Sequence, residues 1–472
     1  MLRYLTVQEM RDTEKAAFSM GVPSLLPMET AARGLEEALW ERCPGGRALF
    51  VCGAGNNGAD GLAAARLFHL HGGRAEALLV GSRFTEENLL QQKTLQYLGI
   101  PVTTDPGSAR FTGIDAAVDA LFGIGLARPL EGPYPDLIEK IGTAPFVIAA
   151  DVPSGMDADT GRPMDVCVRA DVTVTFHAPK TGLVLTQCPD RVGALRIQDV
   201  GFTHDDRGIP AYEAGDYEAL RRHRPRNAHK ASCGRVLVVG GDAGMCGAAA
   251  MCALGALKAG AGLVTILCEE RSLPILQALV PNAMCLPFTS WREGLPAFDA
   301  AAVGCGLRMD DFKREAVLTV LEKAPRAVID AGALDTLKNA PLKYPERAVI
   351  TPHPGEAARI LGTAAGDIVS DPLKAAGALT DKTGAAVILK GAVSVIRDKT
   401  RLALNTVGTP ALAKGGSGDA LSGILAAELC AREDPFEAAR VSCLRLGLAG
   451  LEGEKRYGTD GLLTKEMLRC LP

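Results

Sequence analysis

The chain has 472 residues, of which 47% are hydrophobic and 22% are charged, and its net charge is −4. A single hydrophobic core stops growing at roughly 250–300 residues, so we expect two or more domains. Because the charge is nearly balanced and no long basic run occurs, nothing points to nucleic acid or an anionic membrane as a partner.

The 13 cysteines are scattered, and no C-x-x-C pair occurs. This distribution disfavours a metal cluster and a secreted disulfide framework, and it fits a reducing cytosol. The N-terminus lacks the apolar core of a signal peptide, and no run approaches the roughly 20 apolar residues of a membrane span. We therefore expect a soluble, cytoplasmic protein.

The first half has the pattern of alternating helices and strands. A helix is predicted over residues 6–20, with Thr6 as its N-cap. Strands are predicted at residues 48–53, 75–80, 116–123, 146–152, 171–176 and 194–200, with helical segments between most of them. This order favours a mostly parallel sheet covered on both faces, which is a three-layer α/β domain.

A polar stretch over residues 203–230 follows, and we place the domain boundary near residue 210. Its basic cluster, residues 221–224, is predicted to be a solvated surface segment. The second half restarts the α/β pattern with a strand at 234–241 and a helix at 247–260. Further strands are predicted at residues 263–268, 300–306, 327–334, 348–353, 386–391, 393–398 and 401–405.

A glycine-rich loop in the first half, VCGAGNNGADG at residues 51–61, joins the strand predicted at residues 48–53 to a helix predicted over residues 62–70. Backbone N–H groups at such a turn suit an anion, although a purely structural turn is about as compatible with the glycines. The paired amides Asn56 and Asn57 favour a ligand site, because two side-chain carbonyls on a turn are useful ligands.

Acidic residues lie at the ends of later strands in the first half. The carboxyl ends of parallel strands form the ligand crevice, so Asp119, Asp151 and Ser154 are expected to converge with Asn57. Oxygen ligands of low total charge suit a weakly held monovalent cation better than zinc. The alternative is that either aspartate caps a helix or a turn.

The sharpest signal in the second half is KGGSGDALSGILAA at residues 414–427. Its glycines let the chain fold around an oxyanion, and the following helix adds the positive end of its dipole. Asp419, at the helix start, would be stabilised as an anion and is placed to remove a hydroxyl proton during phosphoryl transfer. The alternative is a plain N-cap.

Two strand ends in the second half carry further candidates. Lys390, before Gly391, can meet phosphates as a point charge, although a surface lysine would look the same. His353 in TPHPGE is expected to contact a ligand rather than to lie in the core. Glu356 is expected to act in the first turn of a helix rather than at a metal-bound water.

Taken together, the strings GAGNNGADG, TPHPGE, LKG and GGSGD resemble those of the bifunctional NAD(P)H-hydrate repair enzymes, over essentially the whole chain. The resemblance implies a Rossmann-like three-layer epimerase domain over residues 1–210. It also implies a ribokinase-like α/β dehydratase domain over residues 211–472. Such proteins interconvert the R and S hydrates of NADH and NADPH and dehydrate the S form, releasing phosphate and AMP from ADP or phosphate and ADP from ATP.

Carried over residue by residue, the resemblance implies a set of site residues. In the first domain, hydrate would be bound by Asn56, Asn57, Gly58, Ala59 and Asp60, by the stretch Gly123, Ile124, Gly125, Leu126, Ala127, Arg128 and Pro129, and by Asp151. Asp151 would be the acid–base group, and potassium would be held by Asn57, Asp119 and Ser154. In the second domain, hydrate would be bound by Ala248, Gly306, His353 and Asp419, with Asp419 as base. The adenine nucleotide, ADP or ATP accompanied by magnesium, would be bound by Lys390, Gly391, Ala392, Val393, Ser394 and Gly418. A homo-oligomer is also implied.

Some positions depart from the family pattern. Ala59 replaces a glycine, which would cost roughly 1–2 kcal/mol if the backbone there had positive φ. Gly332 stands where the family has an aspartate, so a carboxylate is missing from a strand end. Ala231 replaces a glycine of the family pattern, and residues 304–311 differ from the family's usual sequence. These leave nucleotide and hydrate preference open.

Two other functions fit parts of the pattern. A kinase of a small alcohol or vitamin precursor would need the same glycine-rich loop and aspartate. The first domain could be a non-catalytic binding or dimerisation module. The TPHPGE string and the attached first domain argue against the kinase, and the presence of Asn57, Asp119, Asp151 and Ser154 argues for an active first domain.

Overall fold

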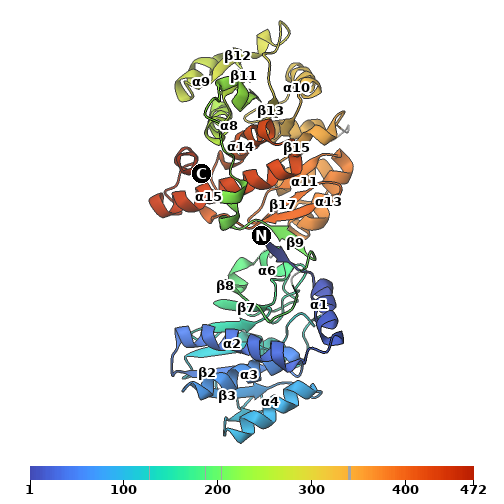
Figure 1. The fold of residues 1–472 in the computed structure, drawn as a ribbon, viewed down its shortest axis with the longest axis vertical. Coiled ribbons are helices and arrows are strands. Elements are labelled where there is room, and N and C mark those ends of the chain that lie inside the picture. Colours follow the sequence, from blue (N-terminus) through green and yellow to red (C-terminus); the bar gives the residue numbers. More distant parts are fainter. Residues whose placement is uncertain (127, 186–187, 204, 338–341) are drawn as a thin grey trace. The chain divides into compact units, whose positions relative to one another are not determined.

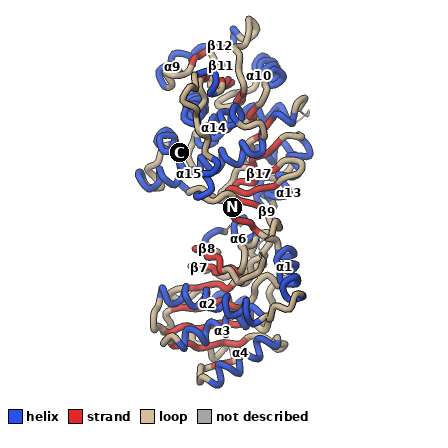
Figure 2. The backbone as a smooth tube through the Cα atoms, viewed as in Figure 1, coloured by secondary structure: helices blue, strands red, loops and turns tan. Residues whose placement is uncertain are grey.

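The computed structural model describes residues 1–126, 128–185, 188–203, 205–337 and 342–472. It divides into two compact units, one formed by residues 3–209 and the other by residues 1–2 and 210–472 (Figure 1). Both units alternate helices and strands along the chain (Figure 2). Within the described residues, no helix is both long enough and apolar enough to cross a bilayer.

The first unit is built on a parallel sheet in the order β4-β3-β2-β5-β6-β7-β8. Its strands are β2 (Arg47–Cys52), β3 (Arg74–Leu79), β4 (Val102–Thr103), β5 (Ala116–Ala120), β6 (Val147–Ala150), β7 (Val172–Phe176) and β8 (Ala194–Gln198). Its helices are α1 (Val7–Ser19), α2 (Leu25–Arg42), α3 (Asn56–Leu70), α4 (Glu86–Tyr97), α5 (Tyr134–Ile141) and α6 (Thr181–Leu185), and the short strand β1 is Leu2–Tyr4.

Strand β2 shows why the first unit has three layers. Ala48, Phe50 and Cys52 pack into one core with side chains of α2 and α3. Leu49 and Val51, which point to the other face, pack with side chains of α5. Since successive side chains of a strand alternate between faces, a strand that is apolar throughout must be covered on both sides. The predicted three-layer arrangement is confirmed.

The second unit has a larger sheet, in which the strands from β9 onward follow the order β9-β18-β17-β16-β15-β14-β13-β10-β11-β12. Neighbouring strands are parallel from β12 to β16, whereas β17 is antiparallel to both β16 and β18. The strands are β9 (Ile209–Ala211), β10 (Arg235–Val239), β11 (Leu263–Cys268), β12 (Met284–Pro287), β13 (Ala300–Val303), β14 (Ala327–Ile329), β15 (Ala348–Ile350), β16 (Ala386–Leu389), β17 (Ser394–Arg397) and β18 (Leu402–Asn405).

Helices α8 (Cys246–Ala259) and α14 (Ser417–Ala431) pack against each other and against the centre of this sheet. Alanine and glycine on α8 and α14 allow this close contact, because small side chains let helix backbones approach. The remaining helices are α7 (Tyr217–Leu220), α9 (Leu273–Leu279), α10 (Asp311–Lys323), α11 (Pro354–Leu361), α12 (Ala365–Ser370), α13 (Pro372–Thr383), α15 (Pro435–Tyr457) and α16 (Thr464–Met467). The mixed α/β class predicted for both halves is confirmed.

Candidate active sites

The glycine-rich loop of the first unit is shorter than the sequence pattern predicts, because α3 begins at Asn56 rather than at residue 62. Asn56 and Asn57 therefore occupy the first turn of a helix whose N-cap is Gly55. The Asn57 amide nitrogen is buried and has no hydrogen-bond partner in the part of the chain that the structure describes. A buried donor without a partner is rare in folded proteins, which makes this side chain a candidate for contact with a ligand.

Gly58 is fixed by packing. A Cβ built on it would lie 1.9 Å from the backbone oxygen of Gly53, which cannot move without disturbing the loop. Ala59, by contrast, is a fully buried residue inside α3, and its φ is not positive. The strain considered for Ala59 is therefore absent, and alanine is the better helix former at that position.

The contact at Gly58 gives a stability prediction. Gly58→Ala is expected to lower the free energy of unfolding of the first unit by about 2 kcal/mol or more, because a methyl group must displace backbone. Gly55→Ala is the matched control, since nothing lies within 4 Å of a Cβ built there. Urea unfolding of both variants measures the difference, and equal stability of the two would contradict the packing argument.

Asp119 and Ser154 form a buried pair at the carboxyl end of β5. Ser154 donates to Asp119 through its backbone N–H at 2.8 Å and through its hydroxyl at 2.6 Å. The same hydroxyl accepts from the backbone N–H of Phe122, which precedes Gly123. Burial raises the pKa of Asp119 to about 6, although these hydrogen bonds oppose the change. The carboxylate is fully buried, so a nearby cation would stabilise it.

The stretch from Gly123 to Pro129 follows β5, and Ala127 within it lies outside the described residues. A Cβ at Gly123 would lie 3.1 Å from Asn57 Oδ1 and 3.3 Å from Asp151 Oδ2, so all three residues border one space. Ile124, whose backbone oxygen accepts a long 3.4 Å bond from Arg11, is half-buried, as is Leu126. Gly125, Arg128 and Pro129 are exposed.

Asp151 directly follows β6 in a left-handed conformation, with φ of +65°. A non-glycine residue there is uncommon and is typical of functional sites. Its Oδ1 accepts bonds from Lys180 Nζ at 2.5 Å, from the Thr175 hydroxyl at 3.1 Å and from the Phe176 N–H at 3.2 Å. Oδ1 is thus saturated, while Oδ2 faces the space above Gly123. Asp151 therefore does not act as a helix cap.

Lys180 is 1% exposed, and the acidic side chains of Asp60 and Glu14 interact electrostatically with it and with Asp151. Burial raises the pKa of Asp60 well above its usual range, and the charges of Asp151 and Glu14 raise it further while Lys180 lowers it. Burial also raises the pKa of Glu14, with a contribution from Asp151. Carboxyl groups with raised pKa values beside an ion pair are suited to moving a proton near neutral pH.

Asp419 lies in the first turn of α14, whose N-cap is Gly416 with φ of +94°. Burial and the charge of Asp330 raise the pKa of Asp419, while Lys390 lowers it. The helix start was expected to stabilise Asp419 as an anion, but burial and the charge of Asp330 act in the opposite direction, and the net pKa of Asp419 lies above its usual range. A raised pKa makes this carboxylate a better proton acceptor.

Buried Asp330 and half-buried Lys390 form an ion pair beside Asp419. Lys390 Nζ lies 2.9 Å from Asp330 Oδ1, and the Ser422 hydroxyl of α14 donates to Asp330 Oδ2 at 2.7 Å. Lys390 Nζ also lies 3.3 Å from the position of a Cβ on Gly418, so it reaches the first turn of α14. Burial pulls the pKa of Lys390 down, but Asp330 and Glu356 outweigh it and hold that pKa above its usual range. Lys390 is therefore a half-buried, ion-paired cation rather than a freely solvated surface lysine.

His353 and Glu356 form a reciprocal cap at the start of α11. His353 Nδ1 accepts from the backbone N–H groups of Gly355 and Glu356, and Glu356 accepts from the backbone N–H of His353 at 2.8 Å. The first-turn role predicted for Glu356 is confirmed, and Glu356 also lies 3.9 Å from Lys390 Nζ. His353 is outside the core, with its side chain 53% exposed.

The other candidates of the second unit lie near the start of α8, after β13, and in and just after the turn that joins β16 to β17. Ala248, near the start of α8, meets Gly306: a Cβ on Gly306 would lie 3.0 Å from that of Ala248. The turn between β16 and β17 contains Gly391, Ala392 and Val393, with Ser394 as the first residue of β17. A Cβ on Gly332 would lie 2.0 Å from the backbone oxygen of Leu307, so this backbone has no room for a carboxylate there.

The sequence prediction missed Lys180, Glu14 and Asp330. Asp330 directly follows β14, as Asp151 directly follows β6, but the strand predicted over residues 327–334 placed Asp330 inside the strand. Lys180 follows β7 by four residues, but lysines are almost never buried unless paired, and the pairing is not visible in the sequence. Glu14 lies on an amphipathic helix, and nothing in the sequence distinguishes it from an ordinary solvent-exposed glutamate.

Known proteins resemble both units. Family models match residues 236–472 with the description NAD(P)H-hydrate dehydratase, and residues 26–182 with YjeF-related protein N-terminus. The bifunctional NAD(P)H-hydrate repair enzyme of Coxiella burnetii is 34% identical, over 98% of this chain and 96% of that protein. The enzyme of the same name from Escherichia coli is 34% identical, over 90% of this chain and 84% of that protein.

A solved structure resembles the second unit. The ADP/ATP-dependent NAD(P)H-hydrate dehydratase of Bacillus subtilis, co-crystallised with ATP and Mg²⁺, is 30% identical with a TM-score of 0.51. The match covers 56% of this chain and 96% of that one. The fold of the second unit is therefore the ribokinase-like one predicted from its motifs. The chain belongs to the family of bifunctional NAD(P)H-hydrate repair enzymes.

Proposed function

We propose that this chain repairs hydrated NADH and NADPH in two steps. The first unit interconverts the R and S hydrates, and the second dehydrates the S hydrate with ADP or ATP, releasing phosphate and AMP or ADP. The observation that carries the proposal is the cluster of Asp419, Asp330 and Lys390 at the N-terminus of α14, in a chain whose first unit has its own acid–base cluster.

In the dehydration step, Asp419 takes the proton of the C6 hydroxyl, whose oxygen then attacks the terminal phosphorus of the nucleotide. The C6–O bond then breaks with its electron pair on the oxygen, which leaves as inorganic phosphate. The adjacent ring carbon C5 loses a proton to the departing phosphate or to water, and the electron pair of that C–H bond forms the ring double bond. Lys390 faces the phosphates together with the backbone N–H groups at the start of α14. Gly418 lets this ammonium reach the helix terminus, because a side chain there would meet Lys390 Nζ.

Magnesium fits as an ion that arrives with the nucleotide. In the part of the chain that the structure describes, no group of three His, Cys, Asp or Glu side chains could hold a metal ion. Magnesium commonly keeps several waters and is bound by substrate phosphates with one or two carboxylates. Asp330 and Glu356 are the carboxylates beside Lys390 that would complete its coordination.

The kinase alternative predicts a different product. A kinase would leave a stable phosphoester on its alcohol, whereas the proposed reaction releases inorganic phosphate. Phosphorus NMR of a reaction with S-hydrate and ADP or ATP separates the two. Free phosphate in step with restored reduced nicotinamide supports dehydration, and a persistent phosphoester would contradict it.

In the first unit, we assign the proton transfer of epimerisation to Asp151. Its Oδ2 lies beside Gly123 and near Asn57 Oδ1, while Lys180 holds Oδ1. Asp151 has the left-handed backbone that is typical of functional sites, and its Oδ1 is fixed by Thr175 and Phe176 of β7. Asn56 to Asp60 and the stretch that begins at Gly123 would surround the hydrate.

Potassium fits the Asn57, Asp119 and Ser154 oxygens. Asp119 is a buried carboxylate with no ion-pair partner among the described residues, and its raised pKa shows that its charge is poorly compensated. Neutral oxygens with one carboxylate suit a monovalent cation. The bound ion would compensate the buried charge beside the hydrate.

This site predicts potassium-dependent stability. A carboxyl pKa that folding raises to about 6 destabilises the folded state above that pH, by an amount on the order of 3 kcal/mol. The effect disappears below the pKa of the unfolded chain, where Asp119 is protonated in both states. Potassium should therefore raise the Tm by a few degrees at pH 7.5 and much less at pH 5.

Calorimetry in potassium chloride against choline chloride at equal ionic strength checks this. Asp119→Asn should abolish the potassium effect, because the uncompensated charge is gone. An equal Tm in both salts at pH 7.5 would remove potassium from the proposal.

Two further parts of the proposal concern the cell and the assembly. All 13 cysteines are free, which supports a reducing cytoplasm. Self-association into a homo-oligomer rests on the family resemblance, and analytical ultracentrifugation tests it.

A further inference from the structure

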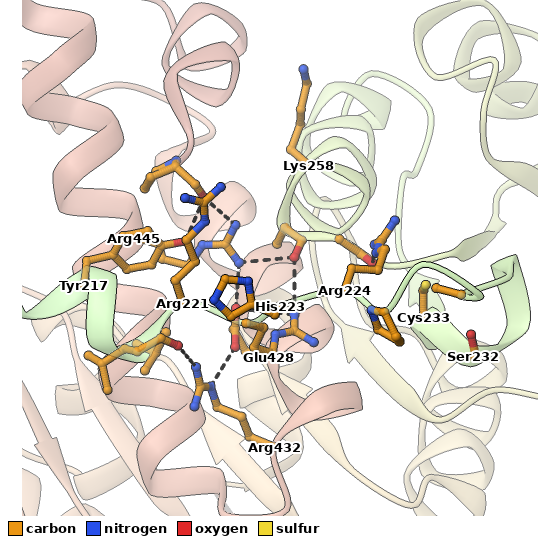
Figure 3. A pocket seen from close by; sticks show the side chains of 18 residues that line it. Tyr217, Arg221, His223, Arg224, Ser232, Cys233, Lys258, Glu428, Arg432 and Arg445 are labelled. Atoms are coloured by element: carbon orange, nitrogen blue, oxygen red, sulfur yellow. Dashed lines mark hydrogen bonds and ion pairs between the residues drawn. The ribbon is translucent and has the colours of Figure 1, made fainter.

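A basic pocket lies on the second unit, away from the candidate active site. Its cavity has a volume of about 380 Å³, and its wall is formed by residues of the linker after α7, the end of α8, and helices α14 and α15 (Figure 3). The pocket borders Glu428 on α14, nine positions after Asp419, which corresponds to about 13 Å along a helix axis. The two sites therefore lie at opposite ends of the same helix.

The basic cluster at residues 221–224 lines this pocket. It was predicted to be a solvated surface segment, and its side chains are exposed, yet they form one side of a cavity. Six permanent cations line the wall, namely Arg221, Arg222, Arg224, Lys258, Arg432 and Arg445. Glu428 is the one acidic side chain among the lining residues.

The cations are only partly compensated. Glu428 is 2.6 Å from Arg445, 2.9 Å from Arg432 and 3.6 Å from Arg222, so one carboxylate serves three guanidinium groups. Figure 3 shows Glu428 beside Arg432, while Lys258 extends away from it. Three carboxylates can be set against the six cations: Glu428, the exposed Glu218 beside Arg221, and any carboxylate at Pro472. The pocket then keeps an excess of three positive charges.

Backbone oxygens do not remove this excess. Arg224 donates to the oxygen of Gly260 at 2.7 Å, and Arg445 donates to that of Ala259 at 3.1 Å. These oxygens carry the negative end of the α8 dipole, which is equivalent to roughly half a charge. Arg445 is 94% buried by the rest of the chain, and its Nε has no acceptor among the described residues.

We propose that this pocket binds a phosphate-bearing metabolite of about the size of a mononucleotide. Several guanidinium groups match the charge and geometry of a phosphate better than those of a single carboxylate. The cavity lies within the usual size range of small-molecule sites. Tyr217, Leu220 and Val441 add an apolar side to the wall, which suits a base or another ring next to the phosphates.

Titration calorimetry of the full chain with pyrophosphate and with ADP tests this proposal. Arg221→Gln with Arg224→Gln removes two exposed cations without touching the buried Arg445–Glu428 pair. We expect this double variant to bind pyrophosphate at least tenfold more weakly at the pocket and to bind one ADP fewer per chain. Lys390→Gln, which alters the proposed catalytic site, should keep the pocket binding, so failure of the proposed function and failure of this inference are distinguishable.

The matched control is Arg314→Gln with Lys399→Gln, which removes two exposed charges elsewhere on the same unit. Unchanged pyrophosphate binding in the Arg221/Arg224 variant would overturn the proposal. Absence of binding to the wild-type chain, or an equal loss in the control, would do the same. Citrate serves as the carboxylate probe, and binding as tight as that of pyrophosphate would overturn the assignment to phosphate.

Discussion

Asp419→Asn is expected to slow dehydration of the S hydrate by well over ~100-fold while leaving the fold and nucleotide affinity intact. Asparagine has nearly the same shape but cannot accept the hydroxyl proton. The surroundings of Asp419 support this role, because burial and Asp330 raise its pKa and so strengthen it as a base. Single-turnover rates with S-hydrate and ADP or ATP measure the loss, and nucleotide titration measures the affinity.

The pH profile separates a base from a structural role. A base must be deprotonated, so the dehydration rate should rise with pH through the pKa of Asp419, and this limb should lie above the range of an ordinary aspartate. Asp381→Asn, an exposed position on α13, is the control and should keep both the rate and the limb. Near-normal turnover in Asp419→Asn would refute the assignment.

Asp151→Asn is expected to abolish most of the interconversion of R and S hydrates, again by ~100-fold or more, without affecting dehydration of pure S-hydrate. The neutral amide can neither exchange a proton nor pair with Lys180, which donates to Asp151 at 2.5 Å. Lys180→Met should have a comparable effect, because it leaves Asp151 buried near Asp60 and Glu14 without its cation.

Chiral separation of the hydrates over time measures the exchange rate. Asp12→Asn changes an exposed carboxylate on α1 and should leave that rate unchanged. If Asp151→Asn folds and still interconverts the epimers at the normal rate, the proton transfer belongs to another group. Asp60 and Glu14 would then be the next residues to replace, since burial raises the pKa of both.

The strand pattern was the most predictable part of the fold. Runs of buried apolar residues such as Ala48–Cys52 leave little alternative to a covered parallel strand. The N-cap at Thr6 was also predictable, since Glu9 completes a capping box with it. Strands β4 and β12 escaped prediction because they are short, their side chains are partly exposed, and each lies at the edge of its sheet.

Site residues could be predicted from the sequence only where their position at the end of a strand or the start of a helix indicates their function. Asp151 and Asp419 follow from their places at a strand end and at a glycine-rich helix start. Part of the increase in the pKa of Asp419 comes from the charge of Asp330. Asp330 is 89 positions earlier in the chain and comes close to Asp419 only through folding. The burial of Lys180 also depends on folding. It is possible only because Asp151, Thr175 and Phe176 accept hydrogen bonds from the Lys180 ammonium group.

The most direct test of the two-step account is to supply the full chain with an equal mixture of R and S hydrates and ADP or ATP, while following the absorbance of reduced nicotinamide. The account predicts that nearly all of the absorbance returns, because R-hydrate is converted to S-hydrate as the latter is consumed. Asp151→Asn should restore about half of it quickly, and only then proceed at the spontaneous rate. No recovery with the wild-type chain, or a wild-type plateau at half, would contradict the account.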